Sequence, residues 1–222
     1  MRDPLSRIAC TVADRLGDVV ERARSAGCRI VELRLDKTGL DGAREAVKAL
    51  AGDGVRVIVT LREAWEGGSY TGGWESKLGV YRSLLEAGAW LVDVEYSHPE
   101  FARFTSELGD RVLASAHYYR FTPASDILYS TVGDMLRSGA EIAKVAAVVE
   151  APEDNWRLIT LNSWRPGRIV SIGMGRRGLV SRLLAPLAGA PFTYAHLGEA
   201  AAPGQPSVQE VLEYWRMLGV IG

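Results

Sequence analysis

The sequence predicts a single-domain α/β protein of the (β/α)8, or TIM, barrel class. Three observations support this: eight apolar segments of strand length, helix-like segments between them, and a chain of 222 residues without an internal linker. Strands that alternate with helices form βαβ units and a parallel sheet. Eight units in this length fit one catalytic barrel spanning residues 1–222, whereas a doubly wound open sheet, the alternative, usually has fewer strands.

The predicted strands follow one another along the whole chain. They are rich in β-branched and aromatic residues, a composition that favours strand over helix. In chain order they cover residues 7–13, 29–36, 55–62, 90–96, 111–118, 141–149, 168–175 and 191–198.

Three segments between and after these strands show apolar residues at helical spacing: residues 14–27, 74–89 and 207–219. Ser207 is placed to cap the last of them, with Glu210 three residues later. Several glycines follow predicted helix ends, including Gly27 and Gly88, where a helix C-terminus favours glycine.

Composition excludes several classes of function. A net charge of −1 gives no overall field for nucleic acid or an anionic membrane, and no apolar run is long enough to span a bilayer. The first residues do not resemble a signal peptide, so a cytoplasmic protein is expected. Cys10 and Cys28 have no metal-binding spacing, and we expect both to be buried, unpaired, as small apolar residues.

Polar residues gather where the strands of a barrel would end, which is where barrel enzymes place their active sites. Glu32 and Arg34 are two residues apart on one strand and therefore share a face. Asp93 and Glu95 form a second such pair, but nothing else distinguishes them. The side chains predicted to project toward one mouth are Glu32, Arg34, Arg62, Glu66, His117 and Lys144.

Lys144 is one of only four lysines and lies within the apolar strand of residues 141–149. Burial disfavours an ammonium that has no partner, and nearby arginines act in the same direction, so we expect an uncharged amine. A neutral amine attacks carbonyl groups and forms Schiff bases. His117 would then take a proton from the carbon beside the imine, and the arginines suggest a carboxylate substrate. These residues predict cofactor-free Schiff-base chemistry on a small keto acid.

The segment GMGRRG, residues 173–178, matches the dinucleotide-binding pattern GxGxxG. It lies in the seventh unit, with too little chain after it to complete a dinucleotide-binding half. In a barrel, the loops after strands seven and eight commonly bind an anion, and we predict that role.

Six segments give nearly the whole chain a resemblance to one family: ELRLD (32–36), TLREAWEGG (60–68), SAHYY (115–119), AKVA (143–146), MGRRGLVSR (174–182) and APGQ (202–205). In this order and spacing, the sequence resembles type I 3-dehydroquinate dehydratase, the Schiff-base enzyme of the shikimate pathway. The resemblance implies a (β/α)8 barrel that is usually a homodimer and uses no metal or cofactor. It also implies removal of water from 3-dehydroquinate to give 3-dehydroshikimate.

The resemblance further implies a role for each matching residue. Lys144 would form the imine, His117 would be the acid/base group, and Glu66 would orient it. Arg182 and Gln205 would bind the substrate carboxylate, and Glu32, Arg34 and Arg62 would contact the rest of the substrate. The APGQ loop would be a lid. Relatives often have serine where this chain has Ala201, so a substrate contact is missing and somewhat weaker binding is expected.

Two other functions remain open at this stage. A class I aldolase-type barrel also uses a Schiff-base lysine, but it would bind a phosphate through backbone amides near residues 175–178 rather than a carboxylate through Arg182 and Gln205. A barrel retained only as a binding protein would be expected to have lost Lys144, His117 or Gln205, and all three are present.

Overall fold

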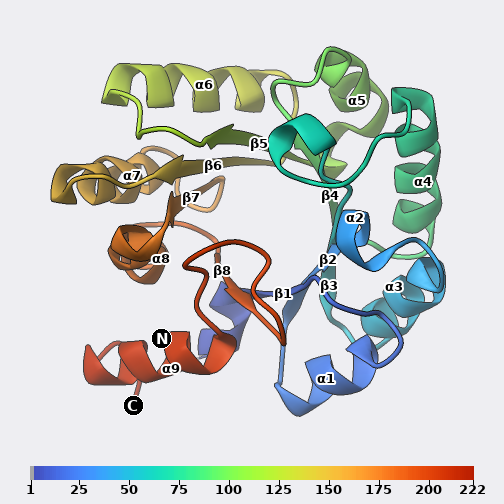
Figure 1. Ribbon diagram of the computed structural model, residues 1–222, viewed down its shortest axis with the longest axis horizontal. Coiled ribbons are helices and arrows are strands. Elements are labelled where there is room, and N and C mark those ends of the chain that lie inside the picture. Colours follow the sequence, from blue (N-terminus) through green and yellow to red (C-terminus); the bar gives the residue numbers. More distant parts are fainter. Residues whose placement is uncertain (1–2) are drawn as a thin grey trace.

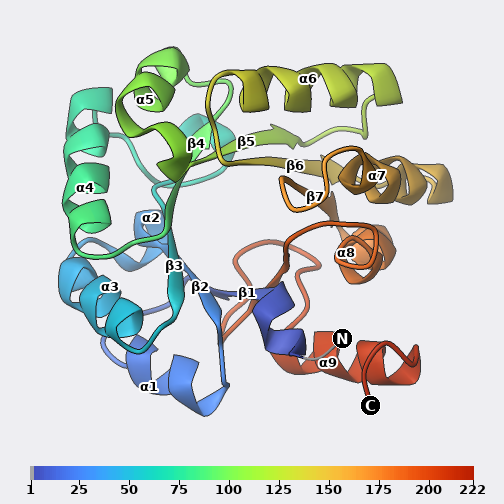
Figure 2. The ribbon, with the colours of Figure 1, turned by 180° about the vertical axis from the view of Figure 1, so that it is seen from behind.

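The structure, a computed structural model, describes residues 3–222. Eight parallel strands form one sheet that curls into a ring, with helices on its outer side (Figures 1 and 2). The strands are β1 (Ile8–Val12), β2 (Ile30–Arg34), β3 (Arg56–Thr60), β4 (Leu91–Glu95), β5 (Val112–Tyr118), β6 (Ile142–Val148), β7 (Ile169–Met174) and β8 (Thr193–His196). Every predicted strand is therefore confirmed, and each is one to four residues shorter in total than the apolar run.

The strand order is β7-β6-β5-β4-β3-β2-β1-β8, so neighbours in the sequence are neighbours in the sheet. β7 and β8 meet at the seam, and among residues 3–222 no paired register joins them. The outer helices are α1 (Val19–Ser25), α2 (Leu35–Thr38), α3 (Ala43–Gly52), α4 (Trp74–Glu86), α5 (Phe101–Leu108), α6 (Ser125–Arg137), α7 (Pro152–Trp164), α8 (Leu179–Leu184) and α9 (Val208–Met217). The chain is a nearly closed (β/α)8 barrel.

Helix boundaries follow local chemistry. α9 starts as predicted: the Ser207 hydroxyl accepts a hydrogen bond from the Glu210 backbone N–H, and the Glu210 carboxylate accepts one from the Ser207 N–H. α1 starts later than predicted, at Val19 instead of residue 14. The preceding Asp14 carboxylate is held by the Arg22 guanidinium at 2.6 and 2.8 Å, which fixes this segment as a turn beside the helix.

The two faces of the strands build two separate cores. Side chains such as Val31 and Val145 point outward to the helices, while Ile30, Leu113 and Ile142 point into the barrel. Because side chains alternate along a strand, the residue two positions after each inward apolar residue also points inward. That next inward layer contains Thr11, Glu32, Thr60, Asp93, Ser115 and Lys144, all buried. The barrel interior thus has an apolar layer, with a polar layer next to it toward the carboxyl ends of the strands.

The prediction that Cys10 and Cys28 are unpaired is wrong: they form a disulfide, with 6.3 Å between their Cα atoms. Cys10 is on β1, and Cys28 lies between α1 and β2. Eighteen residues separate them, but this is one βα unit, and the return of the chain from α1 to β2 places them side by side. A bond that closes a loop of this length restricts the unfolded chain and adds about 3 kcal/mol of stability.

Candidate active site

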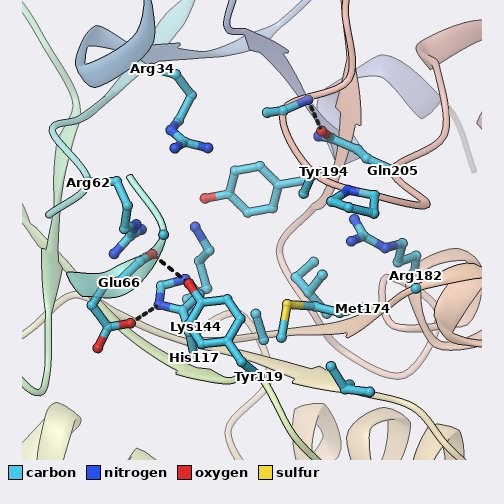
Figure 3. A pocket seen from close by; sticks show the side chains of 18 of the residues that line it. Arg34, Arg62, Glu66, His117, Tyr119, Lys144, Met174, Arg182, Tyr194 and Gln205 are labelled. Atoms are coloured by element: carbon cyan, nitrogen blue, oxygen red, sulfur yellow. Dashed lines mark hydrogen bonds and ion pairs between the residues drawn. The ribbon is translucent and has the colours of Figure 1, made fainter. Parts of the chain in front are cut away.

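A cavity of about 390 Å³ opens at the carboxyl ends of the strands, under the loop between β8 and α9. All eight side chains singled out from the sequence line it: Glu32, Arg34, Arg62, Glu66, His117, Lys144, Arg182 and Gln205. Figure 3 shows Arg182 and Gln205 on one side and Arg62, Glu66 and His117 on the other, with Lys144 between them. Tyr119, Met174 and Tyr194 complete much of the wall.

Lys144 is buried, with 7% of its surface exposed, but its ammonium has partners. Nζ donates a hydrogen bond to Asp93 Oδ2 at 2.9 Å and lies 4.0 Å from Glu32 Oε1. It also lies 4.5 Å from the centre of the Tyr194 ring. The sequence led us to expect an unpaired, uncharged amine from burial and nearby arginines; the structure instead places Lys144 in an ion pair with Asp93.

Asp93 joins Lys144 to a second buried cation. Its Oδ1 accepts a hydrogen bond from Arg62 at 2.8 Å and another from the Ser115 hydroxyl at 2.6 Å. Arg62 is also paired with Glu95 at 2.9 Å. Burial alone would raise the pKa of Asp93, but the positive charges of Arg62 and Lys144 outweigh it and hold that pKa well below its usual range. Asp93 therefore remains a carboxylate at any pH at which the protein works.

His117 lies beside Glu66, with Nδ1 3.1 Å from Glu66 Oε2. The Glu66 carboxylate also accepts a hydrogen bond from Ser97. Burial and the charge of Arg62 lower the pKa of His117, while the bond to Glu66 opposes them without cancelling them. The imidazole is thus neutral near pH 7, with Nδ1–H directed to Glu66 and Nε2 free to accept a proton.

Tyr119 helps to hold the 3-10 turn that carries Glu66 (Ala64–Glu66) against the barrel. The Tyr119 ring stacks on His117 at 5.9 Å, and its hydroxyl donates to the Glu66 carbonyl oxygen. Gly68 lets the loop fold back, because a Cβ at this position would lie 2.0 Å from the Arg62 carbonyl oxygen. No larger residue fits there without moving the turn.

Glu32 and Arg34 form a third part of the cavity. The Glu32 carboxylate accepts hydrogen bonds from Thr11 at 2.8 Å and Thr60 at 2.9 Å. Arg34 makes a two-pronged pair with Asp36, at 2.9 and 3.0 Å. Both side chains are thereby held in fixed positions with polar atoms at the cavity wall.

Arg182 differs from the other buried cations. It is 3% exposed and its Nε donates to the Gly173 carbonyl oxygen at 2.8 Å, but no carboxylate of residues 3–222 forms an ion pair with it. Burial lowers its pKa to about 10, so the guanidinium keeps its charge at neutral pH. A buried positive charge without a counterion is costly, so this guanidinium is suited to pair with an anion.

The APGQ loop, residues 202–205, is fastened to the same region. Gln205 Oε1 accepts a hydrogen bond from the Ala201 N–H at 3.0 Å, and its Nε2 donates to Thr11 at 3.1 Å. Gly204 packs directly on the loop after β7, where a Cβ would lie 2.7 Å from the Gly175 carbonyl carbon. Ala201 lines the cavity as the sequence led us to expect, and it brings no hydroxyl.

Two glycines of the GMGRRG segment allow parts of the chain to pack more closely than a side chain would permit. A Cβ on Gly173 would lie 2.3 Å from the Ser181 hydroxyl oxygen, and one on Gly178 would lie 2.3 Å from the Gly173 carbonyl carbon. The helix that follows, α8, has only six residues. The segment shapes the cavity and positions Arg182, and the dinucleotide-binding reading finds no support.

Within residues 3–222, no group of three or more His, Cys, Asp or Glu side chains is arranged to hold a metal ion. Over the same residues, no helix combines the length and apolar character needed to cross a membrane.

Comparisons with known proteins agree on one family. Residues 8–221 match the family model described as Type I 3-dehydroquinase. A 3-dehydroquinate dehydratase of Dehalococcoides mccartyi is 36% identical over 212 residues, covering 93% of this chain and 94% of that protein. One from Pyrococcus abyssi is 30% identical over 211 residues, covering 94% and 96%.

Solved structures give the same result for the fold. The 3-dehydroquinate dehydratase of Aquifex aeolicus superposes with a TM-score of 0.80 at 26% identity, covering 97% of this chain and 100% of that one. That of Geobacillus kaustophilus superposes with a TM-score of 0.81 at 24% identity, covering 99% and 93%. The chain is therefore a member of the type I 3-dehydroquinase family, a hydro-lyase built on a nearly closed eight-stranded barrel.

Proposed function

We propose that this enzyme dehydrates 3-dehydroquinate to 3-dehydroshikimate through a Schiff base on Lys144, with residues 1–222 acting as one catalytic domain. The observation that carries the proposal is the content of a single cavity: a buried lysine, a neutral histidine and an arginine without a counterion. Relatives that match nearly the whole chain are named for this activity.

The cavity offers a partner for each end of the substrate. The unpaired Arg182 guanidinium suits the carboxylate, and the Gln205 amide lies on the same side (Figure 3). Glu32, Arg34 and Arg62 are placed for the hydroxyl groups on the opposite part of the ring. This assignment puts the ketone near Lys144 Nζ, between the two ends.

The reaction then follows from ordinary imine chemistry. The Lys144 ammonium passes a proton to water, and its lone pair attacks the ketone carbon to give a carbinolamine. The carbinolamine hydroxyl takes a proton back from water and leaves as a water molecule, which gives the iminium. The iminium draws electrons from the neighbouring carbon, so Nε2 of His117 removes a proton there. The electron pair expels the hydroxyl group on the next carbon, which leaves as water after taking that proton from His117. Water finally hydrolyses the imine and releases Lys144.

Glu66 acts through His117. Its carboxylate accepts a hydrogen bond from Nδ1–H, which fixes the tautomer with Nε2 facing the substrate and stabilises the imidazolium that forms when Nε2 takes the substrate proton. Ser97 holds the second carboxylate oxygen, so the pair keeps its orientation when the proton moves.

Reductive trapping tests the proposal directly. Borohydride added with 3-dehydroquinate should reduce the iminium and leave a covalent adduct on Lys144, found by mass spectrometry of the digested protein. The other lysines provide internal controls, since Lys37 is at the surface and Lys77 is fully buried in an ion pair with Glu63 and Glu95. Absence of an adduct, or an equal adduct on Lys37, would contradict the imine mechanism.

The aldolase alternative is not favoured. It required a phosphate bound by backbone amides around residues 175–178, but there the chain packs on itself and on Gly204. The cavity instead presents the side chain of Arg182. Family membership and the chemistry of the cavity lead to the same choice of a carboxylate substrate.

We also propose that the enzyme is a homodimer, as the resemblance implies, and that it works in the cytoplasm. Light scattering of the purified protein measures the first, and a mass of one chain would contradict it. Cell fractionation measures the second. Disulfides are uncommon in cytosolic proteins outside hyperthermophiles, so the thiol state of Cys10 and Cys28 in rapidly alkylated cells is an informative companion measurement.

A further inference from the structure

Tyr194 carries a polar group that the mechanism above does not use. It is on β8, is 4% exposed, and lines the cavity beside Lys144. Its hydroxyl is buried and has no hydrogen-bond partner among residues 3–222. Buried polar groups without partners are rare in folded proteins, and those that occur call for an explanation.

The ring of Tyr194 is held in place from two sides. It packs edge-on against Phe192, with 5.5 Å between the ring centres. Lys144 Nζ lies 4.5 Å from the centre of the Tyr194 ring. Figure 3 shows the ring reaching across the cavity, with the hydroxyl directed to the space bordered by Arg34 and Lys144. A phenylalanine would make the same ring contacts, so these contacts do not account for the hydroxyl.

The charges around this hydroxyl define its hydrogen-bonding role. Burial, together with the carboxylates of Glu32 and Asp93, raises the pKa of Tyr194 well above its usual value, so the group keeps its proton. It is therefore a donor at every working pH. Glu32, whose carboxylate oxygens accept hydrogen bonds from Thr11 and Thr60, borders the same part of the cavity.

A substrate hydroxyl fits between a donor and an acceptor of this kind, because it accepts from one and donates to the other. In 3-dehydroquinate, one carbon beside the ketone is the CH2 that loses the proton, and the other carries a hydroxyl. If the ketone carbon is bonded to Lys144 Nζ, this hydroxyl is on the carbon next to the one attached to Nζ, and Nζ lies 4.5 Å from the centre of the Tyr194 ring.

We propose that the Tyr194 hydroxyl donates a hydrogen bond to the substrate hydroxyl next to the ketone, and that it thereby selects substrates that carry this group. The inference rests on the proposed function, since it assumes that Lys144 bonds to the ketone carbon. Tyr194 also supplies a hydroxyl to a cavity in which Ala201 supplies none. A site that hydrogen-bonds a substrate hydroxyl discriminates against analogues that lack it.

The test compares Tyr194→Phe with the unchanged enzyme on two substrates: 3-dehydroquinate and the analogue that lacks the hydroxyl next to the ketone. With 3-dehydroquinate the variant should lose about 3- to 10-fold in kcat/KM, mainly through KM, the scale of one neutral hydrogen bond. With the analogue the two enzymes should agree within about twofold, because the contact no longer exists. Tyr129→Phe, on the outer helix α6, is the matched control and should equal the unchanged enzyme on both substrates.

The midpoint temperature of thermal unfolding distinguishes a role of the Tyr194 hydroxyl in substrate binding from a role in stabilising the fold. Loss of an unpartnered buried hydroxyl should leave the midpoint of the ligand-free variant unchanged or raise it. An unchanged kcat/KM with 3-dehydroquinate, or an equal loss with both substrates, would overturn the assignment of Tyr194. Neither result touches the proposed function, which fails only if the unchanged enzyme does not convert 3-dehydroquinate or forms no adduct on Lys144.

Discussion

Lys144→Ala should abolish turnover of 3-dehydroquinate, lowering kcat by about four orders of magnitude or more, as expected when a covalent nucleophile is removed. Without the amine there is no iminium, and the proton beside the ketone is far less acidic. Coupled spectrophotometric assay of product formation gives the rate, and borohydride treatment should leave no adduct. The change acts on the chemical step, so no increase in substrate concentration should restore it.

Lys144→Arg tests whether the covalent bond or the positive charge matters. A guanidinium keeps a charge beside Asp93 but is not a nucleophile, so this variant should be as inactive as Lys144→Ala. Both variants should fold, because Asp93 keeps its bonds to Arg62 and Ser115. Lys37→Ala, which removes an exposed lysine bonded only to Ser69, should keep full activity. Near-normal kcat in Lys144→Ala would refute the Schiff-base assignment.

Much of the fold was predictable because one feature of the sequence repeats. Each strand from β1 to β6 places an apolar residue at the bottom of the barrel and a polar one two positions later, as with Ile30 and Glu32 or Ile142 and Lys144. Side-chain alternation alone then directs both to the interior. Since parallel strands share one carboxyl edge, residues as distant as Glu32, His117 and Lys144 were expected in one place, and the cavity contains all three.

Contacts between strands were harder to predict. Asp93 follows the same alternation after Leu91, but only the pairing of strands shows that its carboxylate lies between Arg62 and Lys144. The sequence argument for a neutral lysine failed for this reason. The Cys10–Cys28 bond was missed for a related reason. The two residues are eighteen positions apart in the sequence, and only the path of the chain through α1 and back to the sheet shows that they are neighbours in space.

The roles of the tyrosine hydroxyl groups in the cavity could not be predicted from the sequence. Tyr194 and Tyr119 have apolar rings that favour strand and core, and the sequence does not show where their hydroxyls point. In the structure one hydroxyl holds the Glu66 backbone and the other is left without a partner at the cavity wall. Such assignments depend on side-chain geometry and hydrogen-bond accounting, which residue spacing does not contain.

His117→Ala should slow the chemical step by at least about a hundredfold, the usual contribution of a positioned acid/base group. Lys144 is untouched in this variant, so borohydride should still trap an imine, and the adduct should build up faster than product forms. Single-turnover measurements separate the two steps. A change confined to KM would contradict the assigned role, as would loss of the trapped adduct in a folded variant.

The pH dependence follows from the environment of the same ring. Burial and the charge of Arg62 disfavour the imidazolium, so the pKa of His117 lies below its usual 6.5 and the base stays unprotonated as the pH falls past that value. The acid limb of kcat/KM should therefore lie below pH 6.5. Glu66→Gln removes the one hydrogen bond that raises this pKa, so the limb should move to still lower pH while kcat falls. Because a purely structural loss would lower the rate without moving the limb, an unmoved limb in Glu66→Gln would show that Glu66 does not act through His117.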